Sequence, residues 1–542
     1  MTRSFRYFAA ALGLALVVAV AATAAPRDLD RSFGGDGVVV TAIGEANARA
    51  SALALQPDGR IVVAGSGQVP PGGNSGNALA VVRYLPGGRV DPSFGGGDGV
   101  VERFTEDGTG AGAVAIQPDG KILVAGSASF FTATIHVTRY LANGVRDESF
   151  GDDGVAILPG ICCDGAEATG LAIQPDGKIV VAGWITNTPS MDSFVARLTS
   201  AGQPDESYDG DGVARLELGD AEFKQSRAFG LVLQGDRAVI AGEILTGEGE
   251  RNVMLARLDG TGALDGTFGD GGVVQDRAGN DDDYRARDVA LRNGKLVVTG
   301  FRGARNVGPR NYLIARFEAE DGALDTTFNS EGSDPGHVFA SAGDGVPVAV
   351  GVAVDAAGRV TVAGSAMEDG KRKMLVARYL RSGVRDDAGF RSSDGHVGAR
   401  LIDAGDSGNS EANDVVLDPN GKIVVAGWAL DAGRSDFALA RLGDTPARPN
   451  IRPVARIRGH HDVPRKRWVR FHGMRSSDAD GRIVEYAWRT GDRPYRVLGP
   501  VFWHRFGRPG THVVSLRVRD DRGAVDFATF RVSVRTRSAT TP

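Results

Sequence analysis

Short apolar runs alternate with turn residues along most of the chain. Residues 51–56 form an apolar run, Pro57-Asp58-Gly59 supplies a turn, and residues 60–65 are rich in Ile and Val. Two such runs joined by a tight turn predict a β-hairpin, with Gly59 at a positive φ. Residues 78–85 and 100–104 predict a third and a fourth short strand of the same unit.

The four-strand unit repeats. The phrase Ala-Leu-Gln-Pro-Asp-Gly-Arg-Ile-Val-Val-Ala-Gly recurs with small changes at 54–65, 115–126, 172–183 and 416–427, and looser copies end at Gly242, Gly300 and Gly364. An Arg of the third strand recurs every 56 to 63 residues, at Arg83, Arg139, Arg197, Arg257, Arg316, Arg378 and Arg441. A turn phrase Asp-x-x-Phe-Gly accompanies it, with its aromatic residue at Phe33, Phe94, Phe150, Tyr208, Phe268, Phe328 and Phe390. Seven small antiparallel sheets predict a seven-bladed β-propeller over residues 28–442.

The two ends of the repeat region differ in phase. Residues 28–41 carry only the turn phrase and a fourth strand, whereas the last unit stops after its third strand at 437–442. We therefore expect residues 38–41 to complete the last sheet, which closes the ring and removes two open sheet edges. Each third-strand Arg is followed about eight residues later by an Asp, and repetition favours a structural charge-assisted hydrogen bond. Asp30 is the expected partner of Arg441 across the closure.

A second domain follows a Pro-containing linker at 443–453. Residues 454–536 alternate apolar and polar side chains around turns at Asp480-Gly481, Pro509-Gly510 and Arg522-Gly523. This pattern predicts a small immunoglobulin-like β-sandwich. The chain is thus expected to be all-β, with a propeller followed by a sandwich.

Both regions resemble known families. The Gln-Pro-Asp-Gly-Lys-Ile-Val-Val-Ala-Gly and Asp-x-Ser-Phe-Gly phrases resemble bacterial delta-60 repeats, although middle units such as 234–237 and 355–358 depart from the turn sequence. Ser476-Ser477-Asp478-Ala479-Asp480-Gly481 and Tyr486-Ala487-Trp488 resemble the PKD domain, whose Trp-Asp-Phe-Gly-Asp-Gly motif is degenerate here. The first resemblance implies an exported propeller-like protein without a known reaction. The second implies a spacer or adhesive module.

The N-terminus has the pattern of an export signal. Arg3 and Arg6 precede an apolar run at 8–25, which ends in a small-residue cleavage site before Pro26. An uncleaved membrane anchor is the alternative. We expect residues 1–25 to be removed, which leaves no membrane span and an extracellular or cell-envelope location.

Charge is divided unevenly between the two regions. The whole chain carries −5, but residues 451–536 contain nineteen Lys or Arg against eight Asp or Glu. This leaves a balance near −17 for residues 1–450, and the net charge of −5 for the whole chain argues against nucleic acid as a partner. The two Cys are adjacent, at Cys162 and Cys163, so a disulfide scaffold is excluded and a vicinal disulfide or two buried thiols remain.

Catalytic and metal-binding patterns are sparse. Residues 26–450 contain three His, and neither Gly-x-Ser-x-Gly nor His-Glu-x-x-His occurs. We therefore predict a protein that is not an enzyme and needs no cofactor. Calcium is the one metal considered, because Asp478 and Asp480 of the PKD-like region offer carboxylate oxygens.

Loops that share no motif between units all fall on one face of the predicted ring. Function tends to lie on variable loops held by a rigid scaffold. Aromatic side chains there are the candidate ligand-binding residues: Phe130, Phe131, Trp184, Phe301 and Trp428. The sequence thus predicts an exported binding or adhesion protein whose basic module engages an anionic surface or polysaccharide, an envelope component or a protein. A polymer-degrading hydrolase or lyase is the alternative.

Overall fold

The computed structural model describes two compact units, Met1–Asp444 and Thr445–Pro542. The described residues are 28–44, 46–68, 77–103, 109–129, 133–161, 164–219, 225–247, 249–277, 282–304, 308–387, 390, 398–406, 408–443, 452–478, 483–491, 493–520 and 525–536. These residues form β-strands and connections without a helix. The export signal predicted at 1–25 and most of the predicted linker lie outside them.

The first unit consists of seven four-stranded antiparallel sheets, here called blades, among its described residues. Blades 1 to 3 are β2 (Ala48–Leu55), β3 (Ile61–Gln68), β4 (Asn77–Tyr84), β5 (Val100–Arg103); β6 (Thr109–Ile116), β7 (Ile122–Ser129), β8 (Ala133–Tyr140), β9 (Val155–Ile157); and β10 (Gly165–Ile173), β11 (Ile179–Asn187), β12 (Ser190–Leu198), β13 (Val213–Leu216). Blades 4 and 5 are β14 (Ser226–Gln234), β15 (Arg237–Leu245), β16 (Arg251–Leu258), β17 (Val273–Asp276); and β18 (Asp282–Arg292), β19 (Lys295–Ala304), β20 (Gly308–Glu318), β21 (His337–Ala340). Blades 6 and 7 are β22 (Gly345–Val354), β23 (Val360–Glu368), β24 (Lys371–Tyr379), β25 (Ala399–Ile402); and β26 (Ser410–Leu417), β27 (Ile423–Asp431), β28 (Arg434–Leu442), with β1 (Val38–Thr41).

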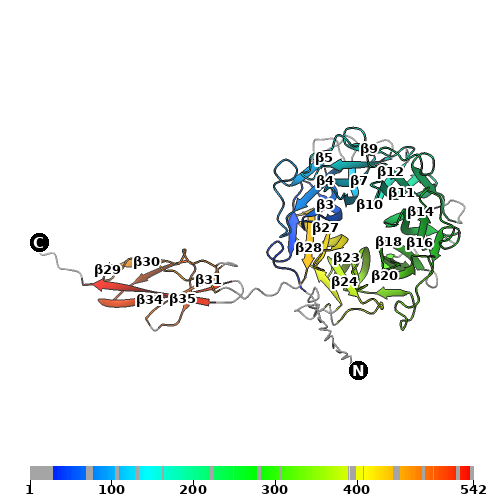
Figure 1. The fold of residues 1–542 in the computed structure, drawn as a ribbon. Coiled ribbons are helices and arrows are strands. Elements are labelled where there is room, and N and C mark those ends of the chain that lie inside the picture. The colour runs from blue at the N-terminus through cyan, green and yellow to red at the C-terminus, as the bar shows by residue number, and fades with distance from the viewer. Residues whose placement is uncertain are drawn as a thin grey trace, which may run out of the picture. The chain divides into compact units, whose positions relative to one another are not determined.

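The blades form a closed ring (Figure 1). The first strand of each blade contacts the first strand of the next, from β2 through β26 and back to β2. β1 pairs with β28 in antiparallel register, with Val38 opposite Ala440. The predicted seven-bladed propeller closed by its N-terminal strand is therefore confirmed.

The apolar core lies between the faces of neighbouring sheets. Across the closure, Val424 and Phe437 of blade 7 pack in one buried cluster with Val63 and Tyr84 of blade 1. The strands rich in Ile, Val and Ala are buried on both sides because every blade is covered by two others. The blades on the two sides of the ring closure thus bury their apolar faces in the same way as the other blades of the ring.

The ring has two faces of different character. Antiparallel order places the turns between first and second strands, such as residues 56–60, on one face together with the third-to-fourth connections. We call this the repeated face, because its sequences recur from blade to blade. The opposite face carries the connections between blades and between second and third strands, and we call it the variable face.

The second unit is a small β-sandwich, as predicted. One sheet contains β29 (Asp462–Pro464), β35 (Val525–Arg535), β34 (Gly510–Asp520), β31 (Ile483–Thr490) and β32 (Arg496–Val497), and the other pairs β30 (Trp468–His472) with β33 (Val501–Arg505). Its core packs around Trp488, which is 1% exposed and donates a hydrogen bond from Nε1 to the Gly499 carbonyl at 2.9 Å. The sandwich buries Phe471 and Leu516 in the same cluster.

Candidate ligand-binding site

The arginine of each third strand makes a recurrent set of contacts. In blade 3, Arg197 Nε lies 2.7 Å from Asp205 Oδ2, and the guanidinium lies over the Tyr208 ring, 4.6 Å from its centroid. Its Nη1 donates a hydrogen bond to the Gly260 carbonyl of blade 4 at 2.6 Å. One buried side chain thus joins its own strand, the following turn and the next blade.

The predicted structural role of these pairs is confirmed throughout the ring. Arg441 pairs with Asp30 at 2.9 Å across the closure, as expected. The spacing is eight residues within the other blades, except that Arg316 pairs with Asp325 nine residues later. The corresponding pairs are Arg83–Asp91, Arg139–Asp147, Arg257–Asp265 and Arg378–Asp386.

The charges of the repeated face are well compensated. Burial raises the pKa of Asp91, but hydrogen bonds from Ser93 and the Arg83 charge outweigh burial and bring that pKa to about 2. A second cation, Arg60 of the hairpin turn, lies 2.9 Å from the same carboxylate. These ionised groups serve the fold, since each is already held by a partner.

A bulge in every first strand shapes the axis of the ring. The bulged residues are Ser51, Gly112, Thr169, Phe229, Arg287, Val350 and Asn413. The second strand approaches closely beside each bulge, so that a Cβ on Gly183 would lie 1.9 Å from the Glu167 carbonyl oxygen. Close approach of the backbone therefore accounts for the Gly that ends each Val-Val-Ala-Gly phrase.

The residues beside the bulges place the predicted aromatic side chains. Trp184, Phe301 and Trp428 all occupy the position after this Gly, in the second strand of their blades, and face Glu167, Arg285 and Glu411 across the strand pair. The equivalent pairs in the other blades are Arg49–Ser66, Gly110–Ser127, Arg227–Glu243 and Val348–Ser365. Sequence analysis assigned these aromatics to loops, whereas the structure places them inside the second strands β11, β19 and β27.

A cleft of about 450 Å³ lies at Trp428 on the variable face. Arg49 lies over the indole, 4.5 Å from the ring centroid, and forms no ion pair with a described carboxylate. Arg372 pairs with Glu411 at 3.1 Å. The lining comes from blades 1, 6 and 7 and consists of Asn47, Arg49, Ser66, Gly67, Gln68, Arg372, Asn409, Trp428, Leu430 and Ser435.

The amide side chains of this cleft are held in place. Asn47 Oδ1 accepts a hydrogen bond from the Ser435 backbone at 2.9 Å, and Asn47 Nδ2 donates to Gln68 at 3.1 Å. Asn409 Oδ1 accepts from the Arg372 backbone at 3.0 Å. An aromatic face with convergent amides and cations is the composition expected of a pocket that binds a polar ligand.

The other predicted site residues have different surroundings. Trp184 is half-buried beneath Arg227, at 5.2 Å. Phe301 is only 8% exposed and lies beneath Arg285 and Arg287, so it presents little surface to a ligand. Phe130 and Phe131 lie outside the described residues.

The structure describes one half of the predicted calcium site. Asp478 is half-buried, whereas Asp480 lies outside the described residues, as do Cys162 and Cys163. In the part of the chain that is described, no three His, Cys, Asp or Glu side chains gather in an arrangement fit for a metal ion. The assignment of Asp478 and Asp480 to calcium stays a prediction.

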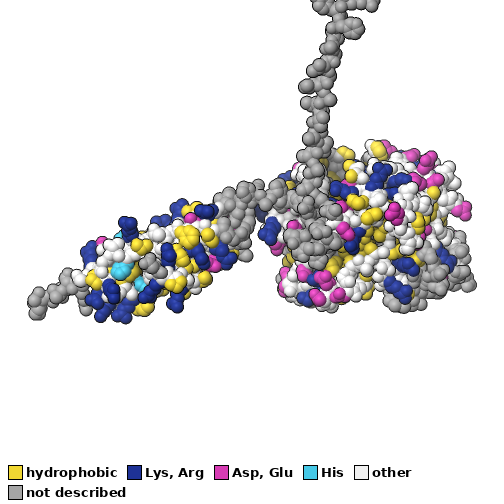
Figure 2. Space-filling model, turned by 90° about the horizontal axis from the view of Figure 1, so that it is seen from below, with side chains coloured by type: hydrophobic (Ala, Val, Ile, Leu, Met, Phe, Trp, Pro, Cys, Tyr) yellow, Lys and Arg dark blue, Asp and Glu magenta, His cyan; other side chains and the backbone are white. Residues whose placement is uncertain are grey.

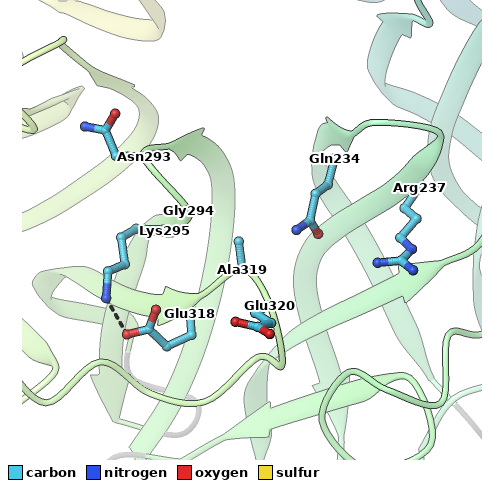
Figure 3. Close-up of a pocket in the computed structure, with 8 residues that line it drawn as sticks. All are labelled: Gln234, Arg237, Asn293, Gly294, Lys295, Glu318, Ala319 and Glu320. Atoms are coloured by element: carbon cyan, nitrogen blue, oxygen red, sulfur yellow. Dashed lines mark hydrogen bonds and ion pairs between the residues drawn. The ribbon is translucent and has the colours of Figure 1, made fainter.

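A second cavity, of about 470 Å³, lies on the repeated face (Figure 3). Figure 3 shows Lys295 directed at Glu318, with Gln234 and Arg237 on the opposite wall. Both cations already belong to structural pairs, since Lys295 lies 2.9 Å from Asp325 and Arg237 lies 3.3 Å from Asp265. The Trp428 cleft is the stronger candidate, because its amides and Arg49 are not committed to such pairs.

Two carboxylates line the first strands at the axis. Asp288 accepts hydrogen bonds from the backbones of Val289 and Val352, and Asp414 accepts from those of Val415 and Leu53. Burial raises the pKa of Asp288 to about 8 and that of Asp414 to about 7. Each carboxyl group bridges its own strand and the next blade, which is a structural role like that of the arginines.

Sequence reasoning missed the arginines and amides that surround the aromatics. Arg49, Arg227 and Arg285 stand seven residues before the first residue of the hairpin turn phrase of their units. Alignment of the repeats on that phrase shows a column of Arg, Gly, Glu, Arg, Arg, Val and Glu within an otherwise apolar strand. This charged column was the available signal for a site at the axis.

Comparisons with known proteins agree with this architecture. The family described as "Domain of unknown function (DUF5122) beta-propeller" matches residues 56–94, 117–150, 174–208, 291–328 and 419–443, and the PKD domain family matches residues 450–534. No helix in the described part of the chain has the length and apolar character needed to cross a bilayer.

Individual relatives match parts of the chain. The collagenase ColQ1 of Bacillus cereus (strain Q1) is 35% identical over 92 residues, which are 17% of this chain and 9% of the collagenase. The PKD1 domain of Vibrio anguillarum Epp is 31% identical and covers 16% of this chain and 98% of its own, with a TM-score of 0.14. Domains 1-2 of Drosophila semaphorin 1b are 12% identical over 78% of this chain and 88% of their own, with a TM-score of 0.40. The family matches and the observed sheets together show that the chain carries DUF5122 β-propeller repeats followed by a C-terminal PKD domain.

Proposed function

We propose that this chain is an exported, non-enzymatic binding or adhesion protein that holds a saccharide at the variable face of its propeller. The observation that carries the proposal is the Trp428 cleft, where an indole meets two arginines and several amide side chains. The flat face of a sugar packs against an aromatic ring, and amide and guanidinium groups match its hydroxyls as donors and acceptors. Among the described residues no carboxylate pairs with Arg49, which favours a ligand with an acidic group.

The PKD domain supports the second part of the proposal, attachment to an anionic surface or polysaccharide. Its outer β30–β33 sheet pairs Trp468 with Arg505 and Trp503 with Arg470 across the strands. The two indoles are 65% and 53% exposed. Lys and Arg side chains cover much of the visible face of this unit (Figure 2). Exposed aromatic and cationic side chains together suit a linear anionic glycan.

An extracellular location is part of the same proposal. It rests on the export signal expected at 1–25, on the PKD domain, and on the 35% identity over 92 residues to a bacterial collagenase. Detection of the mature chain outside the cytoplasm, with a new N-terminus near Pro26, tests this point. A chain found only in the cytoplasm contradicts it.

A carbohydrate array probed with the full chain tests the ligand at the propeller. We expect Trp428→Ala to abolish the strongest signals and Asn293→Ala, on the repeated face, to leave them intact. Equal binding by both variants contradicts the assignment of the cleft. Release of shortened oligosaccharides from a bound polymer supports the hydrolase or lyase alternative instead.

Retention on an anionic polysaccharide matrix tests the PKD surface separately. Trp503→Ala and Arg470→Gln should elute at lower salt than the wild type, because screening weakens exposed charge contacts. Val484→Ala changes an exposed apolar side chain elsewhere on this domain and serves as the control. Retention that is insensitive to salt and to both variants contradicts the proposal.

A further inference from the structure

Three arginines on the variable face of blades 4 and 5 share one buried carboxylate. Arg227, Arg251 and Arg285 approach Glu243 with nitrogen–oxygen distances of 3.6, 3.2 and 3.7 Å. Glu243 has no exposed surface. Arg285 also reaches Asp283 at 2.7 Å. One carboxylate thus contacts three cations, whereas the Asp of a repeated-face pair contacts two, as Asp91 does with Arg83 and Arg60.

A fourth arginine, Arg287, stands beside this group and forms no ion pair with a described carboxylate. Arg287 is the bulge residue of β18 and is half-buried. Its guanidinium lies over Phe229 at 4.1 Å and near Phe301 at 5.3 Å. In the described part of the chain no carboxylate forms an ion pair with it. Its closest described contacts are therefore aromatic rings, while Glu243 and Glu167 act on its charge from farther away.

The cluster carries uncompensated positive charge. Burial lowers the pKa of Arg287, and although Glu243 opposes this effect, the neighbouring Arg285 and Arg227 add to it. Burial lowers the pKa of Arg251 in the same way. Among the described side chains of this network, the four guanidinium groups face three carboxylates, those of Glu243, Asp283 and Glu167. The balance leaves one positive charge in excess.

We propose that the arginine cluster, Arg227, Arg251, Arg285 and Arg287, binds the carboxylate of an acidic saccharide. A planar guanidinium donates two parallel hydrogen bonds to a carboxylate, and the single excess charge matches a monovalent anion. The identity of the ligand as a saccharide rests on the proposed function, whereas carboxylate binding does not. The cluster lies on blades 4 and 5, apart from the Trp428 cleft of blades 1, 6 and 7.

Titration calorimetry of the full chain with three probes tests this inference. Galacturonate carries a carboxylate, galactose is its neutral counterpart, and inorganic sulfate is a divalent anion. We expect galacturonate to bind and galactose to bind at least tenfold more weakly. Sulfate that binds as tightly as galacturonate overturns the assignment to a carboxylate, and equal binding of the two sugars overturns an anion site altogether.

Substitutions locate the site. Arg287→Gln should weaken galacturonate about 10- to 100-fold, as expected for the loss of charge-assisted hydrogen bonds. In the absence of ligand it should not lower the melting temperature, because a desolvated, unpaired charge has been removed. Arg287→Lys keeps the charge without the planar fork and should give a smaller loss. Unchanged galacturonate affinity in both variants overturns the proposal.

Two further variants separate this site from the proposed function. Because the Trp428 cleft is also proposed to take an acidic saccharide, the full chain should show two galacturonate sites, and Trp428→Ala should keep the one that Arg287→Gln loses, since the indole lies on other blades. Arg146→Gln, an exposed arginine paired with Asp153, is the charge-matched control and should also bind normally. A loss in Trp428→Ala with none in Arg287→Gln supports the cleft of the proposed function and contradicts the arginine cluster.

Discussion

Arginines stacked on aromatic rings occur on both faces of the propeller, but their charge partners differ. On the repeated face, Arg83 lies over Phe94 at 4.7 Å and pairs with Asp91 at 2.9 Å. On the variable face, Arg49 lies over Trp428 at 4.5 Å and has no described carboxylate partner. A stacked arginine whose charge is paired with a carboxylate therefore stabilises the fold. A stacked arginine without such a pair is available to a ligand.

The largest expected effect comes from breaking a compensated pair. Arg197→Gln leaves the buried Asp205 with Lys178 as its remaining cation, at 3.1 Å, and removes a hydrogen bond to the next blade. We expect the free energy of unfolding to fall by about 3 kcal/mol, the lower end of the range for broken buried pairs. Denaturant unfolding measures this loss. Arg146→Gln, in an exposed pair, should cost less than about 1 kcal/mol, and equal losses contradict the distinction.

The glycine beside each bulge should be nearly as sensitive. A Cβ at Gly183 would lie 1.9 Å from the Glu167 carbonyl oxygen, so the strand pair must separate. We expect Gly183→Ala to lower the free energy of unfolding by about 1–3 kcal/mol, as overpacking does. Gly165→Ala, in the same strand pair, meets its nearest atom at 3.6 Å and should be tolerated. A tolerated Gly183→Ala shows that the bulge does not constrain this position.

The stability of the propeller should depend on pH through Asp414, a carboxyl group of the first strand of blade 7. Burial raises the pKa of Asp414 to about 7, above its value of 3.8 without burial. The folded state therefore binds a proton that the unfolded state has lost, and this group's contribution to stability is lost as the pH rises from 4 through 7. Its slope is at most about 1.4 kcal/mol per pH unit. Urea unfolding of Asp414→Asn between pH 4 and 8 should give a flatter curve than the wild type. Parallel curves contradict a raised pKa.

The smallest effect on stability should come from an arginine of the variable face. Arg372 and Glu411 form a partly exposed pair at 3.1 Å, which is expected to contribute less than about 1 kcal/mol. Arg372→Gln should therefore fold normally and lose saccharide binding. Arg197→Gln should do the opposite: it loses stability, but each molecule that folds still binds the saccharide. Thermal melting and the carbohydrate array measure the two properties. An Arg372→Gln variant that is destabilised but binds saccharide normally contradicts the distinction between structural arginines on the repeated face and ligand-binding arginines on the variable face.

Periodicity in the sequence accounts for most of the fold. The phase of residues 38–41 predicted the β1–β28 pairing, and the spacing of Arg441 and Asp30 predicted the ion pair across it. Strand lengths were less accurate, since the strand predicted at 51–56 runs from Ala48 to Leu55. Apolar patterning does not specify where a strand ends near a polar axis.

The candidate site was predicted only in part. Trp428 was identified as an aromatic residue on the variable face, but its partner Arg49 comes from the first blade, so the ring closure brings the two together. Phe301 was expected at the surface, whereas two arginines cover it. The bulge at Arg287 depends on hydrogen bonding between strands, which residue type alone does not encode.

The central claim is that ligands bind on the variable face, at the uncompensated arginines. A crystal structure of the full chain with the tightest-binding saccharide of the array tests it most directly. We predict that the sugar ring stacks on Trp428 or that its acidic group contacts Arg287. A saccharide bound only in the repeated-face cavity, beside Arg237 and Lys295, would contradict the account.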